Sequence, residues 1–220
     1  MKALLKTPSS GLSRAWTQCN EYLLGIRTEP ERATEYDCNA TQKDGRAEIA
    51  RNARYRDNFQ YGTIGYLNIG KVLRVLKPGP QDVFCDIGCG MGRIVCVAAR
   101  KRVRKCIGVE LMEPLCEIAQ RNAASLRVRK APIEIVCGDA TTANLSEATV
   151  YFMFNPFGPE SLRDTLENIR GSLSQNPRAI KIAYYNSQYL SVFEGLGWLV
   201  KVHEFDTFRH RVTFWENRGA

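Results

Sequence analysis

The sequence predicts an α/β domain with a doubly wound, mostly parallel seven-stranded sheet, a C-terminal antiparallel hairpin and a helical N-terminal extension. Three observations support this prediction. From Ile64 onward, short β-branched runs alternate with amphipathic helical stretches, a pattern typical of parallel strands joined by crossover helices. A glycine-rich loop follows the first of these runs directly, and two apolar runs separated by a polar turn end the chain.

The first 60 residues differ from the rest of the chain. They are polar and rich in Arg and Glu, with helical stretches expected at residues 12–24 and 46–56 and a polar segment between them at 37–45. We expect residues 1–60 to form a helical extension or lid, and residues 61–220 to form the main domain.

Within that domain, each expected strand is followed by a helix until the final hairpin. The fourth connection is a helix at residues 160–172, which Pro159 can begin because a proline at the first helical position sacrifices no hydrogen bond. A short helix is expected near residues 189–195. The parallel strands are expected at residues 82–86, 105–110, 133–137, 149–155 and 179–185, and the hairpin at 198–205 and 210–215.

Composition narrows the class of protein. Hydrophobic residues make up 44% of the chain and charged residues 25%, which is typical of a globular protein. The longest apolar stretches fall well short of the ~20 residues that a membrane helix needs. The N-terminus lacks the apolar run of a secretory signal. We therefore expect a cytoplasmic protein with no membrane partner.

The eight cysteines and two histidines do not form a metal-binding pattern. No second Cys or His pair stands at zinc-ligand spacing, so we expect no metal. The cysteines fall inside predicted strands and helices, where we expect them to be reduced core residues. The five on which this expectation rests are Cys85, Cys96, Cys106, Cys116 and Cys137.

The net charge of +8 is concentrated in two basic segments, residues 100–105 and 127–130. Each falls where a helix should end and the next strand begin. Cations there complement the negative end of the helix dipole. We interpret the two segments as a solvated basic face, with a nucleic-acid footprint as the alternative.

The strongest motif is Asp86-Ile-Gly88-Cys-Gly90-Met-Gly92, which joins an apolar strand to an apolar helix. Its glycines let the backbone turn tightly and approach a ligand. The pattern differs from the dinucleotide fingerprint, because an acid stands two residues before the first glycine, where it can accept a hydrogen bond from an amino group. Glu110, twenty residues after Gly90, can accept hydrogen bonds from both hydroxyls of a ribose.

With these motifs, residues 60–217 resemble the class I S-adenosylmethionine-dependent methyltransferases. The resemblance implies S-adenosylmethionine as the cofactor. It also implies that Glu110 binds the ribose, that Leu111 lies beside the adenine, and that Asp139, after the third strand, binds the adenine amino group. The cofactor-binding residues implied in this way are Tyr61, Asp86, Gly88, Cys89, Gly90, Gly92, Glu110, Leu111, Asp139, Ala140 and Asn155.

The segment Asn155-Pro156-Phe157 resembles the Asn-Pro-Pro-aromatic motif of family members that methylate nitrogen. The resemblance implies three catalytic residues. The Asn155 side-chain oxygen and the Pro156 carbonyl would accept hydrogen bonds from an amine, while Phe157 would lie near the sulfonium charge. The sequence departs from the motif, since Phe157 replaces the second proline and Gly158 takes the aromatic position. The stretch Phe-Gly-Pro-Glu also resembles the non-SET histone lysine methyltransferases.

Further residues are expected around the acceptor. Tyr184 and Tyr185, at the end of the fifth strand, are expected to face the acceptor pocket as substrate residues, together with Asn186. Tyr55, Asn58 and Tyr61 are expected to close over the methionine end of the cofactor.

The predicted function is methyl transfer to a nitrogen acceptor, which is a small amine, a protein lysine or RNA. Two alternatives belong to other classes. A nicotinamide-dependent oxidoreductase would carry Gly-x-Gly-x-x-Gly, which is absent from the glycine loop. A non-catalytic RNA-binding protein on the same scaffold would have no chemical need for the acids at positions 86, 110 and 139.

Overall fold

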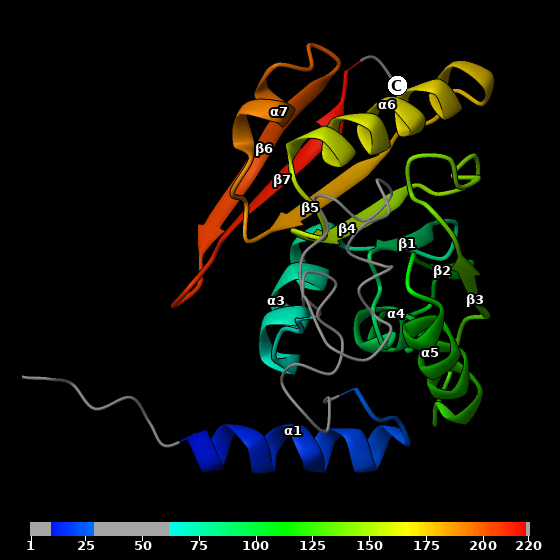
Figure 1. Ribbon diagram of the computed structural model, residues 1–220, viewed down its shortest axis with the longest axis vertical. Helices are drawn as coiled ribbons and strands as arrows, with labels where there is room; N and C mark the ends of the chain where they lie inside the picture. The colour runs from blue at the N-terminus through cyan, green and yellow to red at the C-terminus, as the bar shows by residue number, and fades with distance from the viewer. Residues whose placement is uncertain (1–9, 29–61, 219–220) are drawn as a thin grey trace, which may run out of the picture.

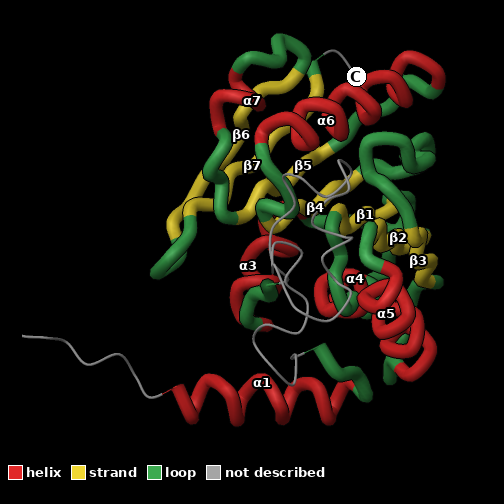
Figure 2. The backbone as a smooth tube through the Cα atoms, in the orientation of Figure 1, coloured by secondary structure: helices red, strands yellow, loops and turns green. Residues whose placement is uncertain are grey.

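The computed structural model describes residues 10–28 and 62–218. They form one central sheet with helices packed on both of its faces (Figures 1 and 2). The strands are β1 (Val83–Ile87), β2 (Lys105–Glu110), β3 (Ile133–Cys137), β4 (Val150–Phe154), β5 (Lys181–Tyr185), β6 (Leu199–Asp206) and β7 (Arg211–Asn217). The helices are α1 (Ser10–Leu24), α3 (Tyr66–Leu76), α4 (Arg93–Ala98), α5 (Glu113–Ser125), α6 (Pro159–Gln175) and α7 (Leu190–Glu194).

The sheet has the strand order β3-β2-β1-β4-β5-β7-β6. The first five strands in that order pair in parallel, while β7 is antiparallel to both β5 and β6. The predicted seven-stranded, mostly parallel sheet with its C-terminal hairpin is thus confirmed. The ends of β2 and β3 are the expected ones, the ends of the other strands differ from the expected ones by at most two residues, and α6 begins at Pro159 as expected.

Apolar side chains alternate between the two faces of the sheet, so both faces are covered by helices. In β1, Phe84 belongs to one buried cluster and Cys85 to the other. Helices α3 and α4 pack on the Phe84 side, and α6 and α7 on the Cys85 side (Figure 1). All five residues of β1 are buried, which explains why four of them are apolar. The exception is Asp86, the fourth residue of the strand.

The strand order reverses between β1 and β4, which pair directly. From β1 the chain moves outward to β2 and β3, and from β4 it moves the other way to β5. In such sheets a crevice opens at the carboxyl ends of the strands at this switch point. The glycine loop after β1 and Asn155 after β4 both lie there.

Helix α1 is attached to the domain through the segment that follows it. The Asn122 side chain exchanges hydrogen bonds with the Arg27 backbone at 2.7 and 2.8 Å, and the Arg127 amide donates to the Leu24 carbonyl at 2.8 Å. The expected helix at 46–56 lies outside the described residues. The division of the chain at residue 60 stays a prediction.

One expectation about the cysteines was wrong. Cys116 and Cys137 form a disulfide, with their Cα atoms 5.8 Å apart. Helix α5 packs on β3 at the edge of the sheet, which brings the two side chains together although they stand 21 residues apart in sequence. Cys85, Cys96 and Cys106 are buried free thiols as expected.

In the described ranges, no helix has both the length and the apolarity to cross a membrane. Across those same residues there is no group of three or more His, Cys, Asp or Glu side chains that could hold a metal ion.

Candidate functional site

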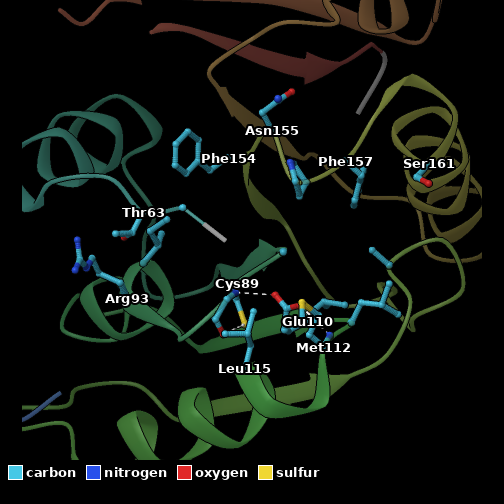
Figure 3. Close-up of a pocket in the computed structure, with 18 of the residues that line it drawn as sticks. Thr63, Cys89, Arg93, Glu110, Met112, Leu115, Phe154, Asn155, Phe157 and Ser161 are labelled. Carbon is cyan, nitrogen blue, oxygen red and sulfur yellow. Dashed lines mark hydrogen bonds between the residues drawn. The ribbon is translucent and has the colours of Figure 1, made fainter. Parts of the chain in front are cut away.

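A pocket of about 300 Å³ opens at the carboxyl edge of the sheet, at the switch point. This volume is at the lower end of the range for small-molecule sites. Figure 3 shows Glu110, Met112 and Leu115 on one side and Phe154, Asn155 and Phe157 across from them. The predicted residues that line it are Gly88, Cys89, Gly90, Glu110, Leu111, Asp139, Ala140, Asn155, Pro156 and Phe157.

The glycine loop and the Asn155 segment touch each other across the switch point. Gly88 has φ +71°, and a Cβ added there would lie 2.5 Å from the Pro156 Cβ. A side chain at position 88 would therefore both strain the backbone and push the two loops apart. Glycine is needed at this position because the glycine loop and the Asn155 segment, which both line the pocket, meet there.

Glu110 ties the glycine loop to the end of β2. Its Oε2 accepts a hydrogen bond from the Gly90 amide at 2.8 Å and its Oε1 accepts one from the Met112 amide at 2.9 Å. Burial raises the pKa of Glu110, and the backbone amides act against that rise. A carboxylate oxygen accepts more than one hydrogen bond, so both oxygens can still receive ribose hydroxyls.

Asp86 lies behind the loop rather than in the pocket wall. It is 1% exposed, and neither carboxyl oxygen has a hydrogen-bond partner among the described residues. Burial, followed by the nearby Glu110, raises the pKa of Asp86 to about 8, while the Val95 amide lowers it without forming a regular hydrogen bond. A buried, unpartnered acid at this point suits a cationic ligand that would draw it into the charged form.

Asp139 and Ala140 line the pocket at the end of β3. The Asp139 Oδ1 accepts hydrogen bonds from the Thr141 amide and hydroxyl at 2.9 and 2.7 Å, which fixes the turn. The Asn168 side chain donates to the Ala140 carbonyl at 3.0 Å and so anchors the turn to α6. Acids therefore stand at the ends of three neighbouring strands, as the sequence predicted.

Asn155 is held in an unusual conformation at the end of β4. It has φ +38° and is 6% exposed. The Tyr184 hydroxyl donates to its Oδ1 at 2.6 Å. The Tyr184 ring stacks on Phe193 with centroids 5.0 Å apart, so the hydroxyl is itself fixed by the core. Burial raises the pKa of Tyr184, which keeps this hydroxyl a donor.

The two expected substrate tyrosines do not line the pocket, which corrects their expected placement. Tyr184 and Tyr185 are 0% and 1% exposed, because successive residues of β5 point into the two opposite core clusters. The Tyr184 hydroxyl reaches the site through its hydrogen bond to Asn155. Any direct contact of the two tyrosines with an acceptor stays a prediction.

The next residue, Asn186, does line the pocket, with φ +57°. Its Oδ1 lies 3.1 Å from the His210 Nδ1. The His210 ring contacts Phe154, another lining residue, with centroids 5.8 Å apart. Burial and the nearby Arg209 lower the pKa of His210.

Arg93 is the lining residue that sequence reasoning missed most clearly. It is 3% exposed, its Nη2 lies 3.1 Å from the Glu21 Oε1, and its Nε donates to the Thr28 Oγ1 at 2.5 Å. Its Nη1 donates to the Ile64 carbonyl at 3.3 Å. These partners lie 29 to 72 residues away in sequence, so no local pattern marks them.

Other predicted residues fall elsewhere. Gly92 directly precedes α4, and a Cβ added there would lie 3.2 Å from the Ala119 Cβ of α5. Tyr55, Asn58 and Tyr61 lie outside the described residues. Besides Arg93, the lining residues that the sequence did not indicate include Gly62, Thr63, Ile94, Met112, Leu115, Phe154, Ser161 and Gln188.

The sequence is similar to that of lysine methyltransferases. A family model described as "Histone methylation protein DOT1" matches residues 46–135, less than half of the chain. A protein-lysine N-methyltransferase from Saccharolobus islandicus is 34% identical over 87 residues, which is 39% of this chain and 53% of the relative. An H3 lysine-79-specific histone-lysine N-methyltransferase from Dictyostelium discoideum is 37% identical over 94 residues, which is 37% of this chain and 5% of the relative. The chain thus spans about half the length of the archaeal relative and a small part of the other.

Solved structures share the fold at low identity. An RNA methyltransferase from Salinibacter ruber, crystallised with S-adenosyl-L-homocysteine, aligns with TM-score 0.55 and 23% identity over 71% of this chain and 94% of that one. TrmN from Thermus thermophilus aligns with TM-score 0.58 and 19% identity, covering 71% of this chain and 50% of that one.

A doubly wound sheet of this strand order, with acids and a glycine loop around a pocket at its switch point, is typical of α/β proteins that bind a nucleoside-containing ligand. Part of the sequence is similar to the histone methylation protein family and to a protein-lysine N-methyltransferase, and the fold is shared with solved methyltransferases. One of those structures holds S-adenosyl-L-homocysteine, the demethylated form of the expected cofactor S-adenosylmethionine. The residues present fit it, because the unpartnered buried Asp86 suits a cation and Glu110 retains acceptor capacity for a ribose.

Proposed function

We propose that this protein transfers a methyl group from S-adenosylmethionine to nitrogen, and that the acceptor is a lysine ε-amine of a protein. One observation carries the proposal. The segment Asn155-Pro156-Phe157 lines the pocket beside the glycine loop, with Asn155 fixed by the Tyr184 hydroxyl at 2.6 Å. The similarity to the archaeal protein-lysine N-methyltransferase supports lysine as the acceptor.

When bound, the cofactor supplies a methyl group on a positively charged sulfur. Glu110 and Asp139 are the residues that would hold its adenosine, and the Gly88 and Gly90 backbone would lie against it. Phe154 and Phe157 give the acceptor side aromatic walls, which exclude water and tolerate positive charge.

Asn155 has the chemistry to orient an amine. Its Oδ1 already accepts one hydrogen bond from Tyr184 and has a second lone pair for an amine N–H. A lysine ε-amine that has lost its ammonium proton to water and is held there would keep its nitrogen lone pair free for in-line attack. The Asn155 side chain carries no charge, so its contribution is positioning rather than proton removal.

The test is radiolabelled methyl transfer from S-adenosylmethionine to a cell extract that is then separated into protein, RNA and small-molecule fractions. The proposal expects label in protein, recovered as methyllysine after hydrolysis. It also expects Asn155→Ala to bind the cofactor normally and to lower turnover about 100-fold, because the acceptor is misplaced. Label only in RNA would contradict the lysine assignment, and unchanged turnover in Asn155→Ala would contradict its role.

A further inference from the structure

Two loops at the amino edge of the sheet, opposite the pocket, bring the basic segments together. One loop joins α4 to β2 and the other joins α5 to β3. The amides of Lys130 and Ala131 donate to the Ala99 carbonyl at 2.9 and 3.0 Å, which ties the loops side by side. Six exposed cations result, here called the cationic edge: Arg100, Lys101, Arg102, Arg127, Arg129 and Lys130.

The charge of the cationic edge is not compensated within the described part of the chain. None of the six side chains forms an ion pair there, whereas their neighbours Arg104 and Lys105 pair with Glu147. The helix dipoles do not compensate it either. Each helix C-terminus carries about −0.5 elementary charge, so α4 and α5 offset about one of the six positive charges. The helix dipoles therefore do not explain why six cations gather at this edge of the sheet.

Two exposed aromatic side chains lie on the helix attached to the second loop. Tyr22 and Trp16 of α1 are 75% and 54% exposed. The Arg127 guanidinium lies over the Tyr22 ring at 5.6 Å, so the Tyr22 ring adjoins the cationic edge. The two rings are six residues apart, or about 9 Å along the helix. Figure 1 shows α1 running along the outside of the domain, away from the sheet.

We propose that the cationic edge and the exposed rings of Trp16 and Tyr22 bind single-stranded nucleic acid. The cations neutralise phosphates, and the rings stack with unpaired bases, which a duplex or an acidic peptide does not offer. The surface lies at the opposite edge of the sheet from the pocket. We therefore expect the strand to bind without added cofactor.

The test is fluorescence anisotropy with the full chain and a labelled oligouridylate of about 20 nucleotides, long enough to span such a surface. We expect binding that weakens with salt, with a slope of log K against log salt approaching about −4 if all six cations contact phosphates. No binding at low salt would overturn the proposal, as would equal affinity for a base-paired duplex of the same length or equal competition by polyglutamate.

Matched variants locate the surface. Arg100→Glu with Arg102→Glu should lower the affinity at least about tenfold and reduce the salt slope by about 1.4. Arg163→Glu with Arg218→Glu, which changes the same charge elsewhere on the surface, should leave both values unchanged. Equal losses in the two pairs would mean that net charge alone drives binding, which overturns the proposal.

The contribution of the exposed aromatic rings is measured separately from that of the cations. Trp16→Ala should weaken binding about fivefold or more without changing the salt slope, since stacking releases no counterions. Circular dichroism checks that the variant is folded. An unchanged affinity would mean that base stacking on Trp16 does not contribute to binding, and this would overturn the proposed preference for single strands. Methyl transfer enters none of these measurements, so the proposed catalytic function is tested independently.

Discussion

At the scale of single residues, the two acids nearest the glycine loop differ in how they are solvated. Glu110 receives two backbone amides, while Asp86 receives no regular hydrogen bond among the described residues and has a pKa raised to about 8. Without a ligand, Asp86 is therefore largely protonated at neutral pH, whereas a cation bound nearby would favour its charged form.

This difference predicts how stability depends on pH. The folded-state pKa of Asp86 lies above its ordinary value of 3.8, so its contribution to stability is full below about pH 4 and is lost as the pH rises to about 8. We expect the ligand-free protein to lose stability across that window, by at most about 6 kcal/mol, and Asp86→Asn to remove this dependence. Thermal unfolding at several pH values measures both. Equal pH profiles for the two proteins would contradict the assignment.

Asn155 owes its orientation to Tyr184. Tyr184→Phe should lower turnover about tenfold while leaving cofactor affinity unchanged, because it removes the hydrogen bond to the Asn155 side chain and, besides that, only a long one from the Tyr189 amide at 3.4 Å. Steady-state kinetics and cofactor titration measure the two quantities. The matched control is Tyr151→Phe, whose hydroxyl donates to the Leu145 carbonyl at 3.1 Å away from the pocket. It should cost stability and not turnover, so equal turnover losses in the two variants would contradict the positioning role.

At the scale of elements, the N-terminal helix is part of the site's support. Glu21 of α1 and Thr28 after it hold the guanidinium of Arg93, which both begins α4 and lines the pocket. Glu110 of β2 therefore fixes the glycine loop through the Gly90 amide. The loop leads directly into α4, whose first residue is bound by the N-terminal segment. The N-terminal segment, which looked separate in sequence, is thus joined through Arg93 to the helix that follows the glycine loop.

This arrangement predicts a large effect from one substitution. Glu21→Ala leaves the buried Arg93 without that carboxylate and should lower the free energy of unfolding by about 3–5 kcal/mol. The control is Asp206→Ala, which breaks the exposed pair with Arg211 and should cost less than about 1 kcal/mol. Denaturant unfolding compares them. A small loss for Glu21→Ala would mean that α1 is only loosely attached.

At the scale of the whole molecule, the sequence was sufficient to predict the sheet, its hairpin and most of the pocket-lining motifs. Those features are local, because a strand pattern, the glycine loop and a strand-end acid can each be recognised from a few consecutive residues. The topology then brings them to one edge. Glu110 and Asp139 were found in this way, at the ends of two neighbouring strands.

What the sequence did not reveal depends on pairs that are distant along the chain. The bond between Glu21 and Arg93, the disulfide between Cys116 and Cys137, and the inward burial of Tyr184 are set by tertiary packing. The cytoplasmic location stays a prediction, as do the functional roles assigned to individual site residues.

The most direct measurement of the central claim is calorimetric titration of the ligand-free protein with S-adenosylmethionine and, separately, with NADH. We expect one molecule of S-adenosylmethionine to bind per chain, NADH not to bind, and Glu110→Ala to abolish binding while keeping the far-ultraviolet circular dichroism of the fold. Binding of NADH, or undiminished binding of S-adenosylmethionine by Glu110→Ala, would contradict the account of the site.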